Sequence, residues 1–271
     1  MSTRVISSRD NPQYKQIRQL ATSAQARRKA GMTLLDGVHL CEAWLQHRGA
    51  PNLCIAGENA RAHPEVAQII TRCEALGADC LWLPDPLFAS LSQVEHGVAV
   101  LFIVALPVQA TLSRLDSPAL LLDGLQDPGN LGSILRTAAA AGIHRVFCGE
   151  GTVSAWSPKV MRAGMGAHFV LEIVEDADLD ALVAGASVPV YATSSHASQT
   201  IYDADLSAPS AWMFGHEGKG VSEKLLAAAS ATLTIPQMPQ VESLNVAASV
   251  AVCLFEQVRQ QRVTRPVDPG R

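Results

Sequence analysis

The spacing of apolar residues predicts alternating short strands and amphipathic helices along the first hundred residues. A helix begins at Asn11-Pro12, because Tyr14, Ile17 and Leu20 then follow at helical spacing. Two further stretches with helical periodicity cover residues 39–47 and 64–76. Short apolar runs predict strands over 32–35, 53–56 and 98–106. This part of the chain is therefore predicted to form a small α/β unit.

From Ala119 onward the alternation becomes more regular. Strands are predicted over 119–122, 145–148, 168–174, 188–193, 212–215 and 232–236. Helices are predicted over 131–141 with Asn130 as its cap, from Ser157-Pro158 to the break at 164–166, and over 243–261. Strands that alternate with helices form a mostly parallel sheet that is covered on both faces.

The two patterns predict an α/β protein with two domains, a smaller one over 1–107 and a larger one over 119–264. Residues 108–118 form the expected linker, because the segment from Pro107 to Pro118 contains two prolines and mixed polar residues. An open α/β sheet binds its ligand at the carboxyl ends of its strands. The loops after Leu122, Thr193, Gly215 and Pro236 are therefore the first places to look for chemistry.

Composition narrows the class of protein. Of the 271 residues, 48% are apolar and 17% are charged, which is ample for buried cores and atypical of disorder. No uninterrupted apolar stretch approaches the roughly 20 residues of a membrane span, and the polar N-terminus does not resemble a signal peptide. We therefore expect a cytoplasmic protein that does not contact a membrane. The six scattered cysteines form no zinc-ligand pattern, so we expect buried, reduced thiols and no metal.

Charge is distributed unevenly along the chain. The net charge of −4 disfavours nucleic acid as a partner, yet residues 1–30 carry seven basic side chains and one acid. Such a segment is suited to neutralise phosphates, although a solvated helix face with uneven charge would look the same.

The first loop leads from Asp127 into a helix that contains Asn130, Gly132 and Arg136. Gly132 leaves the first turn bare, which suits an approaching anion. Arg136 lies in an otherwise apolar helix, where a charge is costly unless it is paired or exposed. On the residues alone, a helix cap at Asn130 and a structural ion pair at Arg136 are favoured over an anion-binding role.

The second loop, residues 214–222, has three glycines after an apolar strand, which permits close approach to a ligand. It matches neither a Walker A loop nor a dinucleotide-binding loop, because the required glycines are absent. The third loop runs from Ile235-Pro236 to Ser243 and Asn245 at the start of an alanine-rich helix. By themselves, Ser243 and Asn245 at a helix start indicate no more than helix capping.

Taken together and in order, the three loops resemble the motifs of the SpoU/TrmH family of RNA ribose methyltransferases, within the knotted SPOUT superfamily. The matching residues are Asn130, Gly132, Arg136, Thr137 and Ala138 in the first motif, Phe214 to Gly220 in the second, and Ile235, Pro236 and Ser243 to Val246 in the third. The N-terminal part resembles, more loosely, the substrate-binding domain that is often joined to this family, and the basic residues expected to bind RNA are Arg4, Arg9, Lys15, Arg27 and Arg28.

The resemblance implies a fold, a reaction and a donor. It implies a trefoil knot in the last part of the sheet, a homodimer, and transfer of a methyl group from S-adenosylmethionine to a ribose 2′-hydroxyl of structured RNA. Ribosomal RNA is the preferred substrate and transfer RNA the alternative. The long closing helix suits a dimer interface through Val246, Val250, Cys253 and Leu254, although these residues equally suit packing on the sheet.

The resemblance also implies roles for residues of this chain. Gly215, Ile235 and Leu244, with Thr193, correspond to the positions that hold the donor. Asn130, Arg136, Glu217, Ser243 and Asn245 correspond to the polar residues around the reacting ribose. Arginine stays protonated, so a phosphate clamp that polarises the hydroxyl is a physically easier role for Arg136 than that of a base.

The third motif departs from the family pattern at Gln237 and Pro239, where methionine and glycine are usual. Proline removes an N–H and fixes φ, so the backbone path around the donor is expected to differ there. Two other functions are also considered: a non-catalytic RNA-binding protein of the same fold, and a nucleotide-dependent enzyme with an ordinary open α/β sheet. The intact polar set disfavours the first, and the missing nucleotide fingerprints disfavour the second.

Overall fold

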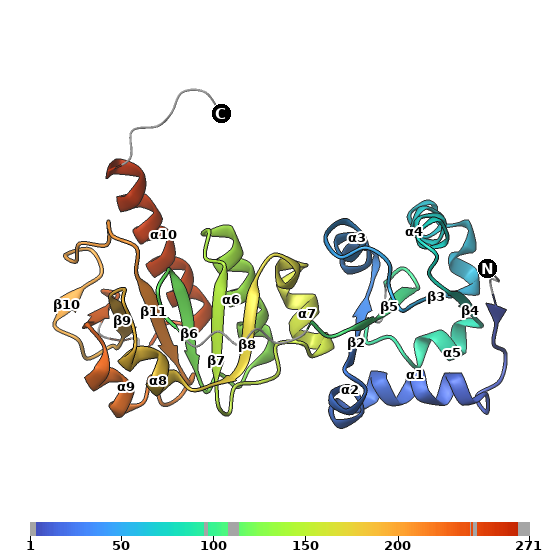
Figure 1. Cartoon of the computed structure of the whole chain (residues 1–271), viewed down its shortest axis with the longest axis horizontal. Helices are drawn as coiled ribbons and strands as arrows, with labels where there is room; N and C mark the ends of the chain where they lie inside the picture. Colours follow the sequence, from blue (N-terminus) through green and yellow to red (C-terminus); the bar gives the residue numbers. More distant parts are fainter. Residues whose placement is uncertain (1–3, 95–96, 108–113, 239, 241–242, 265–271) are drawn as a thin grey trace. The chain divides into compact units, whose positions relative to one another are not determined.

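A computed structural model of the chain describes residues 4–94, 97–107, 114–238, 240 and 243–264 (Figure 1). The chain forms two compact units. The first comprises residues 1–108 together with 156–169, and the second comprises 109–155 and 170–271. The predicted linker falls at this boundary, but its residues 108–113 lie outside the described part of the chain. The contiguous domains predicted over 1–107 and 119–264 did not anticipate that 156–169 packs with the first unit.

The first unit is built on a five-stranded mixed sheet in the order β1-β4-β3-β5-β2. The strands are β1 (Arg4–Val5), β2 (Met32–Asp36), β3 (Leu53–Gly57), β4 (Cys80–Leu83) and β5 (Val100–Ala105). β5 runs antiparallel to both of its neighbours, β2 and β3. The helices are α1 (Pro12–Thr22), α2 (Ala24–Ala30), α3 (Val38–His47), η1 (Glu58–Ala62), α4 (Pro64–Ala75), α5 (Asp85–Ala89), α7 (Pro158–Gly164) and η2 (Ala167–Phe169).

The second unit is a seven-stranded sheet in the order β10-β12-β9-β11-β6-β7-β8, and every described strand pair in it is parallel. The strands are β6 (Ala119–Asp123), β7 (Arg145–Gly149), β8 (Glu172–Ala177), β9 (Val190–Thr193), β10 (Gln199–Thr200), β11 (Ala211–Gly215) and β12 (Ala231–Thr234). The helices are α6 (Pro128–Ala140), α8 (Leu179–Ala184), α9 (Glu223–Ala228) and α10 (Val246–Thr264).

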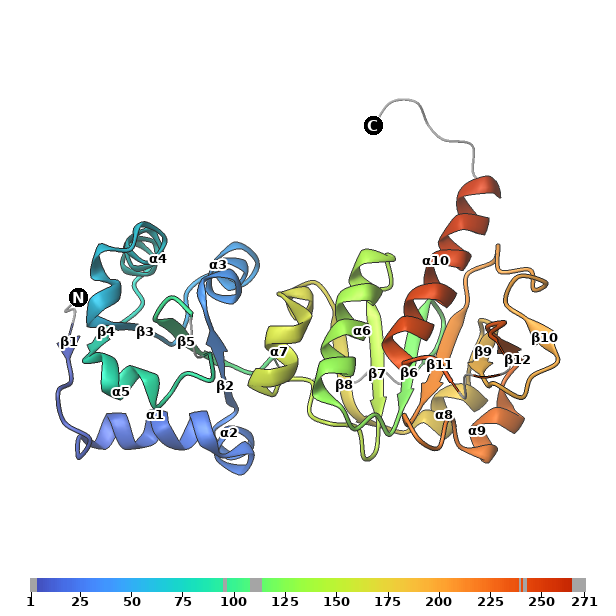
Figure 2. The ribbon, with the colours of Figure 1, turned by 180° about the vertical axis from the view of Figure 1, so that it is seen from behind.

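Helices cover both faces of this parallel sheet, as predicted. α6 and α10 lie side by side on one face, in front of the strands in Figure 2, and α8 and α9 lie on the other face. A buried amide fixes α10 to the sheet, because Gln257 accepts a hydrogen bond from the Trp212 indole at 2.8 Å and donates one to Ser210 at 2.6 Å. Val250, Cys253 and Leu254 are buried within the chain, so they pack on the sheet rather than form an outer surface.

Three elements begin three or more residues away from their predicted starts. β8 begins at Glu172 rather than at residue 168, because His168 and Phe169 turn into the first unit and contact Trp156 and Trp44. α10 begins at Val246 rather than at 243, and α6 begins at Pro128 rather than at 131. The strands β1, β4 and β10 and the helices α2 and α5 were not predicted, because each is too short to show a period. All six cysteines are buried free thiols, as predicted.

Among the described residues, no helix is long and apolar enough to cross a membrane.

The returning segment 156–169 is held in the first unit by hydrogen bonds and an ion pair. Thr33, in β2, donates a buried hydrogen bond to the Trp156 carbonyl at 2.7 Å. Arg162 of α7 lies 4.0 Å from Asp36, whose carboxylate also accepts hydrogen bonds from Ser92 and from the Gln93 N–H. Burial raises the pKa of Asp36, and those hydrogen bonds and the Arg162 guanidinium oppose the shift.

Candidate functional site

The first loop shows why Asn130 is available for chemistry. Asp127, not Asn130, caps α6: its side chain accepts a hydrogen bond from the Asn130 N–H at 2.8 Å, and Pro128 occupies the first helical position. The predicted cap was therefore three residues too late. An acidic residue followed directly by proline is a strong helix start, and it forestalls a start at Asn130. The Asn130 side chain is thereby left for contacts outside its own helix.

The second loop is a tight hairpin at the carboxyl end of β11. The His216 N–H donates to the Gly220 carbonyl at 3.0 Å, and the Gly220 N–H donates back to the His216 carbonyl at 2.8 Å. A Cβ atom on Gly215 would lie 2.0 Å from the backbone of Gly220. Glycine is therefore required at Gly215, because the two backbone segments touch there.

Glu217, at the tip of this hairpin, joins the second loop to the first. One carboxylate oxygen accepts hydrogen bonds from the Asp127 N–H at 3.0 Å and the Asn130 amide at 3.1 Å, and the other accepts one from the Gln126 N–H at 3.0 Å. Partial burial alone would raise the pKa of Glu217, but the hydrogen bonds from Gln126, Asn130 and Asp127 lower it overall. A carboxylate that is held ionised by three donors is poorly suited to accept a proton, so it orients its neighbours.

Asn245 joins the third loop to the same cluster. Its amide donates to the Asn130 side-chain oxygen at 2.9 Å, and its own side-chain oxygen accepts the N–H groups of Ala247 and Ala248, which cap α10. The capping that the sequence pattern indicated is therefore present, and the same side chain also reaches across to the first loop. Three loops that are distant in sequence are thus connected by the hydrogen-bonded series Glu217–Asn130–Asn245, which we call the amide–carboxylate clamp.

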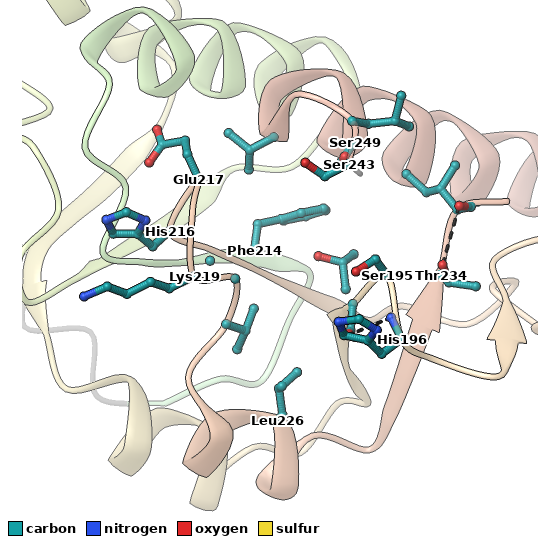
Figure 3. A pocket seen from close by; sticks show the side chains of 18 of the residues that line it. Ser195, His196, Phe214, His216, Glu217, Lys219, Leu226, Thr234, Ser243 and Ser249 are labelled. Carbon is teal, nitrogen blue, oxygen red and sulfur yellow. Dashed lines mark hydrogen bonds between the residues drawn. The ribbon is translucent and has the colours of Figure 1, made fainter. Parts of the chain in front are cut away.

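A pocket of about 470 Å³ lies beside the clamp (Figure 3). All four residues that were predicted to hold the donor line it: Thr193, Gly215, Ile235 and Leu244. Glu217 and Ser243 line it as well, whereas Asn130, Arg136 and Asn245 do not. The structure therefore gathers the predicted donor-binding residues in one place, and their role in binding stays a prediction. Of the two residues that depart from the family pattern, Gln237 lines the pocket, and Pro239 lies outside the described residues.

The pocket combines an apolar lining with polar residues. Its apolar wall suits a flat ring system and is formed by Phe214, Leu226, Leu233, Ile235, Leu244 and Val246. Ser195 and His196 from the loop after β9, and His216 and Lys219 from the second loop, also line it, as Figure 3 shows. None of these four residues was predicted from the sequence to have a role in the site. The strand ends marked both loops as informative, but neither the strand ends nor the motifs assign a role to these four side chains.

Arg136 lies on the exposed side of α6, away from the buried row that faces the sheet. Within the described part of the chain, its guanidinium makes no ion pair or hydrogen bond. The alternative that Arg136 serves as one half of a structural ion pair therefore finds no partner there. Because the guanidinium is exposed to water, its charge carries no desolvation cost on this otherwise apolar helix, and it is accessible to an anionic ligand.

The five basic residues predicted to bind RNA all lie in the first unit, and the local contacts of Lys15 and Arg27 can be described. Lys15 forms an ion pair with Asp10 at 2.9 Å, and Arg27 donates to the Leu20 carbonyl at 2.8 Å. Partial burial and the neighbouring Arg28 lower the pKa of Arg27. Arg4 lies in the edge strand β1, and Arg9 and Arg28 are exposed. Arg9 and Arg28 are therefore better placed than Lys15 and Arg27 to contact a partner.

Comparisons with known proteins agree on one family. The family model for the SpoU rRNA methylases matches residues 117–255. An uncharacterised tRNA/rRNA methyltransferase of Synechocystis sp. is 35% identical over 264 residues and 94% of each chain. The 23S rRNA (guanosine(2553)-2′-O)-methyltransferase RlmP of Bacillus subtilis is 30% identical over 255 residues, which cover 92% of this chain and 97% of that protein.

Solved structures give the same result. An RNA 2′-O ribose methyltransferase has a TM-score of 0.82 at 28% identity, covering 95% of this chain and 99% of its own. An AdoMet-bound rRNA methyltransferase from Sinorhizobium meliloti also has a TM-score of 0.82, at 27% identity, with 94% and 97% covered. The three motif loops, the parallel sheet that carries them and these relatives agree: the chain belongs to the SpoU family of rRNA methylases.

Proposed function

We propose that this chain transfers the methyl group of S-adenosylmethionine to a ribose 2′-hydroxyl of ribosomal RNA. The observation that carries the proposal is the amide–carboxylate clamp, which connects the three motif loops beside a pocket of suitable size. Family membership supports the reaction. The names of the relatives, including a 23S rRNA 2′-O-methyltransferase, support the RNA class.

The residues of the pocket fit S-adenosylmethionine. A cavity of about 470 Å³ lies in the range typical of small-molecule sites, and its apolar wall suits an adenine ring. Gly215 leaves no room for a side chain between the backbone of the second loop and β11, so ligand contacts there would come from main-chain groups. Thr193, Gly215, Ile235 and Leu244 would hold the donor. When bound, its sulfonium supplies a methyl group that is already activated.

The protein's remaining task is to align the 2′-oxygen and to assist the loss of its proton. Ser243, in the pocket wall, and the clamp residues Asn130 and Asn245 are the polar groups we assign to the ribose. Glu217 fixes the orientation of the Asn130 amide. Arg136 clamps an RNA phosphate and polarises the hydroxyl, because a protonated guanidinium donates well and accepts protons poorly.

We assign RNA binding to the first unit, with Arg4, Arg9, Lys15, Arg27 and Arg28 as its basic residues. Exposed Arg9 and Arg28 carry most of the contact, because Lys15 and Arg27 are engaged locally. Charge neutralisation makes such binding salt-dependent. In a filter-binding titration with ribosomal RNA, the Arg9→Ala, Arg28→Ala double variant should bind more weakly and with a shallower salt dependence. An unchanged salt dependence would remove these residues from the interface.

We also infer a cytoplasmic homodimer whose C-terminal part is threaded as a trefoil knot, as the family resemblance implies. Phe255 on α10 supports an interface between subunits, because this large apolar side chain is 48% exposed in the single chain. Light scattering on the purified protein should give twice the mass of one chain, and Phe255→Glu should reduce it. A monomeric wild-type protein would contradict the dimer, and an experimental structure would decide the threading.

The test of the proposed function is transfer of labelled methyl from S-adenosylmethionine to total RNA from a strain that lacks this protein. Nucleoside digestion should yield a labelled 2′-O-methylnucleoside from ribosomal RNA, and Arg136→Ala should reduce transfer at least about 100-fold with little change in donor binding. Label in transfer RNA instead would correct the substrate. Donor binding and transfer both absent would favour a non-catalytic RNA-binding protein.

A further inference from the structure

The hairpin that forms one side of the pocket is closed by a single histidine. The main chain of His216 donates to the Gly220 carbonyl and accepts hydrogen bonds from the N–H groups of Lys219 at 3.2 Å and Gly220 at 2.8 Å. Its side chain adds a further bond, because Nδ1 accepts the Gly218 N–H at 2.9 Å. His216 therefore satisfies three successive amides of the loop by itself.

The bond from Gly218 requires a particular state of the imidazole. A neutral imidazole has one nitrogen that accepts and one that donates, so acceptance at Nδ1 places the proton on Nε2. A protonated imidazole donates at both nitrogens and therefore repels the Gly218 N–H. Histidine is the side chain whose charge ordinarily changes between about pH 5 and 8. The closed loop is thus compatible only with neutral His216.

We propose that His216 is a positioning residue, whose neutral side chain holds the loop Gly215–Gly220 in its donor-binding shape. The inference rests on the proposed function, because it takes the pocket to be the S-adenosylmethionine site. His216 would not touch the reacting atoms. It would act through the Gly218 backbone, and loss of its bond would weaken donor binding without changing the transfer chemistry at saturating donor.

Other ionisable groups border the loop and must be separated from His216 in any test. These groups are Glu217 and Lys219 of the loop itself, Asp123 at the end of β6, Asp127 after β6, Glu223 at the start of α9, and His196 in the loop after β9. Asp123 accepts the Ser222 N–H at 2.9 Å, directly after the loop. Of these neighbours only His196 is also a histidine. A pH effect must therefore be shown to vanish on substitution of His216 alone.

Asparagine is the matched substitution, because its side-chain oxygen accepts an N–H two residues ahead and does not titrate. This chain uses that contact twice: Asn11 accepts the Gln13 N–H at 2.9 Å, and Asn245 accepts the Ala247 N–H at 2.9 Å. His216→Asn should therefore preserve the loop, whereas His216→Ala should open it. His144→Asn makes the same exchange at an exposed histidine outside this pocket and serves as the control.

The experiment measures the dissociation constant of S-adenosylmethionine for the full-length protein by calorimetry, between about pH 8 and 5.5. One lost hydrogen bond of about 0.5–1.5 kcal/mol corresponds to about 2- to 12-fold in affinity. We expect the affinity of the wild-type and His144→Asn proteins for S-adenosylmethionine to fall by about that factor as the pH is lowered. His216→Asn should stay near the wild-type affinity of pH 8 with a flatter profile, and His216→Ala should be weak throughout.

Two outcomes would overturn the proposal. One is a His216→Ala protein with wild-type affinity at pH 8, and the other is a His216→Asn protein that keeps the full pH dependence. The KM for donor should rise in His216→Ala while kcat stays within about twofold, so a fall in kcat alone would also count against a positioning role. Failure of the proposed function would look different, because wild type itself would then bind no S-adenosylmethionine.

Discussion

At the scale of single residues, the clamp explains why the motifs contain an acid and two amides. Glu217 only accepts hydrogen bonds, and it receives them from Asn130 and from two backbone amides. Its position therefore decides which way the Asn130 amide points. With its nitrogen toward Glu217, Asn130 turns its oxygen toward Asn245 and receives that residue's N–H. One charged group thus sets the orientation of two neutral ones.

Glu217→Gln tests whether Glu217 sets the orientation of Asn130 and Asn245. Glutamine has a single acceptor oxygen for three donors, so at least one N–H loses its partner. We expect methyl transfer to fall at least about tenfold and the free energy of unfolding to fall by about 1 kcal/mol, a small value because the site is exposed. Urea unfolding and the labelled-methyl assay measure the two effects. Full activity in Glu217→Gln would show that the clamp is not required.

The effect of Glu217→Gln on the free energy of unfolding should also depend on pH. The pKa of Glu217 is lowered in the folded protein, so its contribution to stability is fully present above the ordinary value of 4.5 and is lost as pH falls through the lowered value. The difference in unfolding free energy between wild type and Glu217→Gln should therefore narrow when the pH drops below about 4.5. A difference that stays constant down to pH 3 would mean that Glu217 does not gain its hydrogen bonds as a carboxylate.

At the scale of elements, most periodic parts could be predicted, as could the helix starts that proline marks in α1 and α7, but the start of α6 could not. The strands β6, β7 and β11 lie within a residue of their predicted bounds, because continuous apolar runs mark buried parallel strands. The start of α6 was missed because Asp127, Pro128 and Asn130 all favour helix starts, and the sequence does not rank them. The contact of Asn130 with Glu217 and Asn245 was out of reach, since it depends on loops about 90 and 115 residues away.

Asp127→Ala tests how far the start of α6 matters to the site. The substitution removes the side-chain cap on the Asn130 N–H but keeps the Asp127 backbone N–H that Glu217 accepts. We expect the free energy of unfolding to fall by about 1 kcal/mol, as is typical of a lost cap, and methyl transfer to fall with it. Asp127→Asn retains a capping oxygen, so it should keep most of the wild-type free energy of unfolding and most of the methyl transfer. Equal loss in the two variants would mean that the charge, and not the cap, is what matters.

At the scale of the whole molecule, the division of the chain into units could be predicted only in part. The change of pattern near residue 108 marks one boundary. The return of 156–169 to the first unit has no such mark, because its helix pattern is the ordinary one for a segment between two strands of a parallel sheet. Only tertiary contacts reveal it: the Thr33 hydroxyl on the Trp156 carbonyl, and Trp44 against Phe169 at 5.4 Å between ring centroids.

This arrangement predicts that residues 1–107 do not make a complete domain. Without 156–169, the fragment exposes apolar surface on β2 and α3 and leaves Asp36 without the Arg162 guanidinium. A fragment in which a Gly/Ser linker attaches residues 154–170 to residue 107 should unfold at a higher urea midpoint than residues 1–107 alone. Adding Thr33→Val to the linked fragment should lower its urea midpoint part of the way back, because it deletes the buried hydrogen bond to the Trp156 carbonyl. Equal midpoints for the two fragments would mean that 156–169 merely rests on the first unit. A higher midpoint for the linked fragment would mean that the first unit is completed by residues 156–169, which lie in the sequence between β7 and β8 of the parallel sheet.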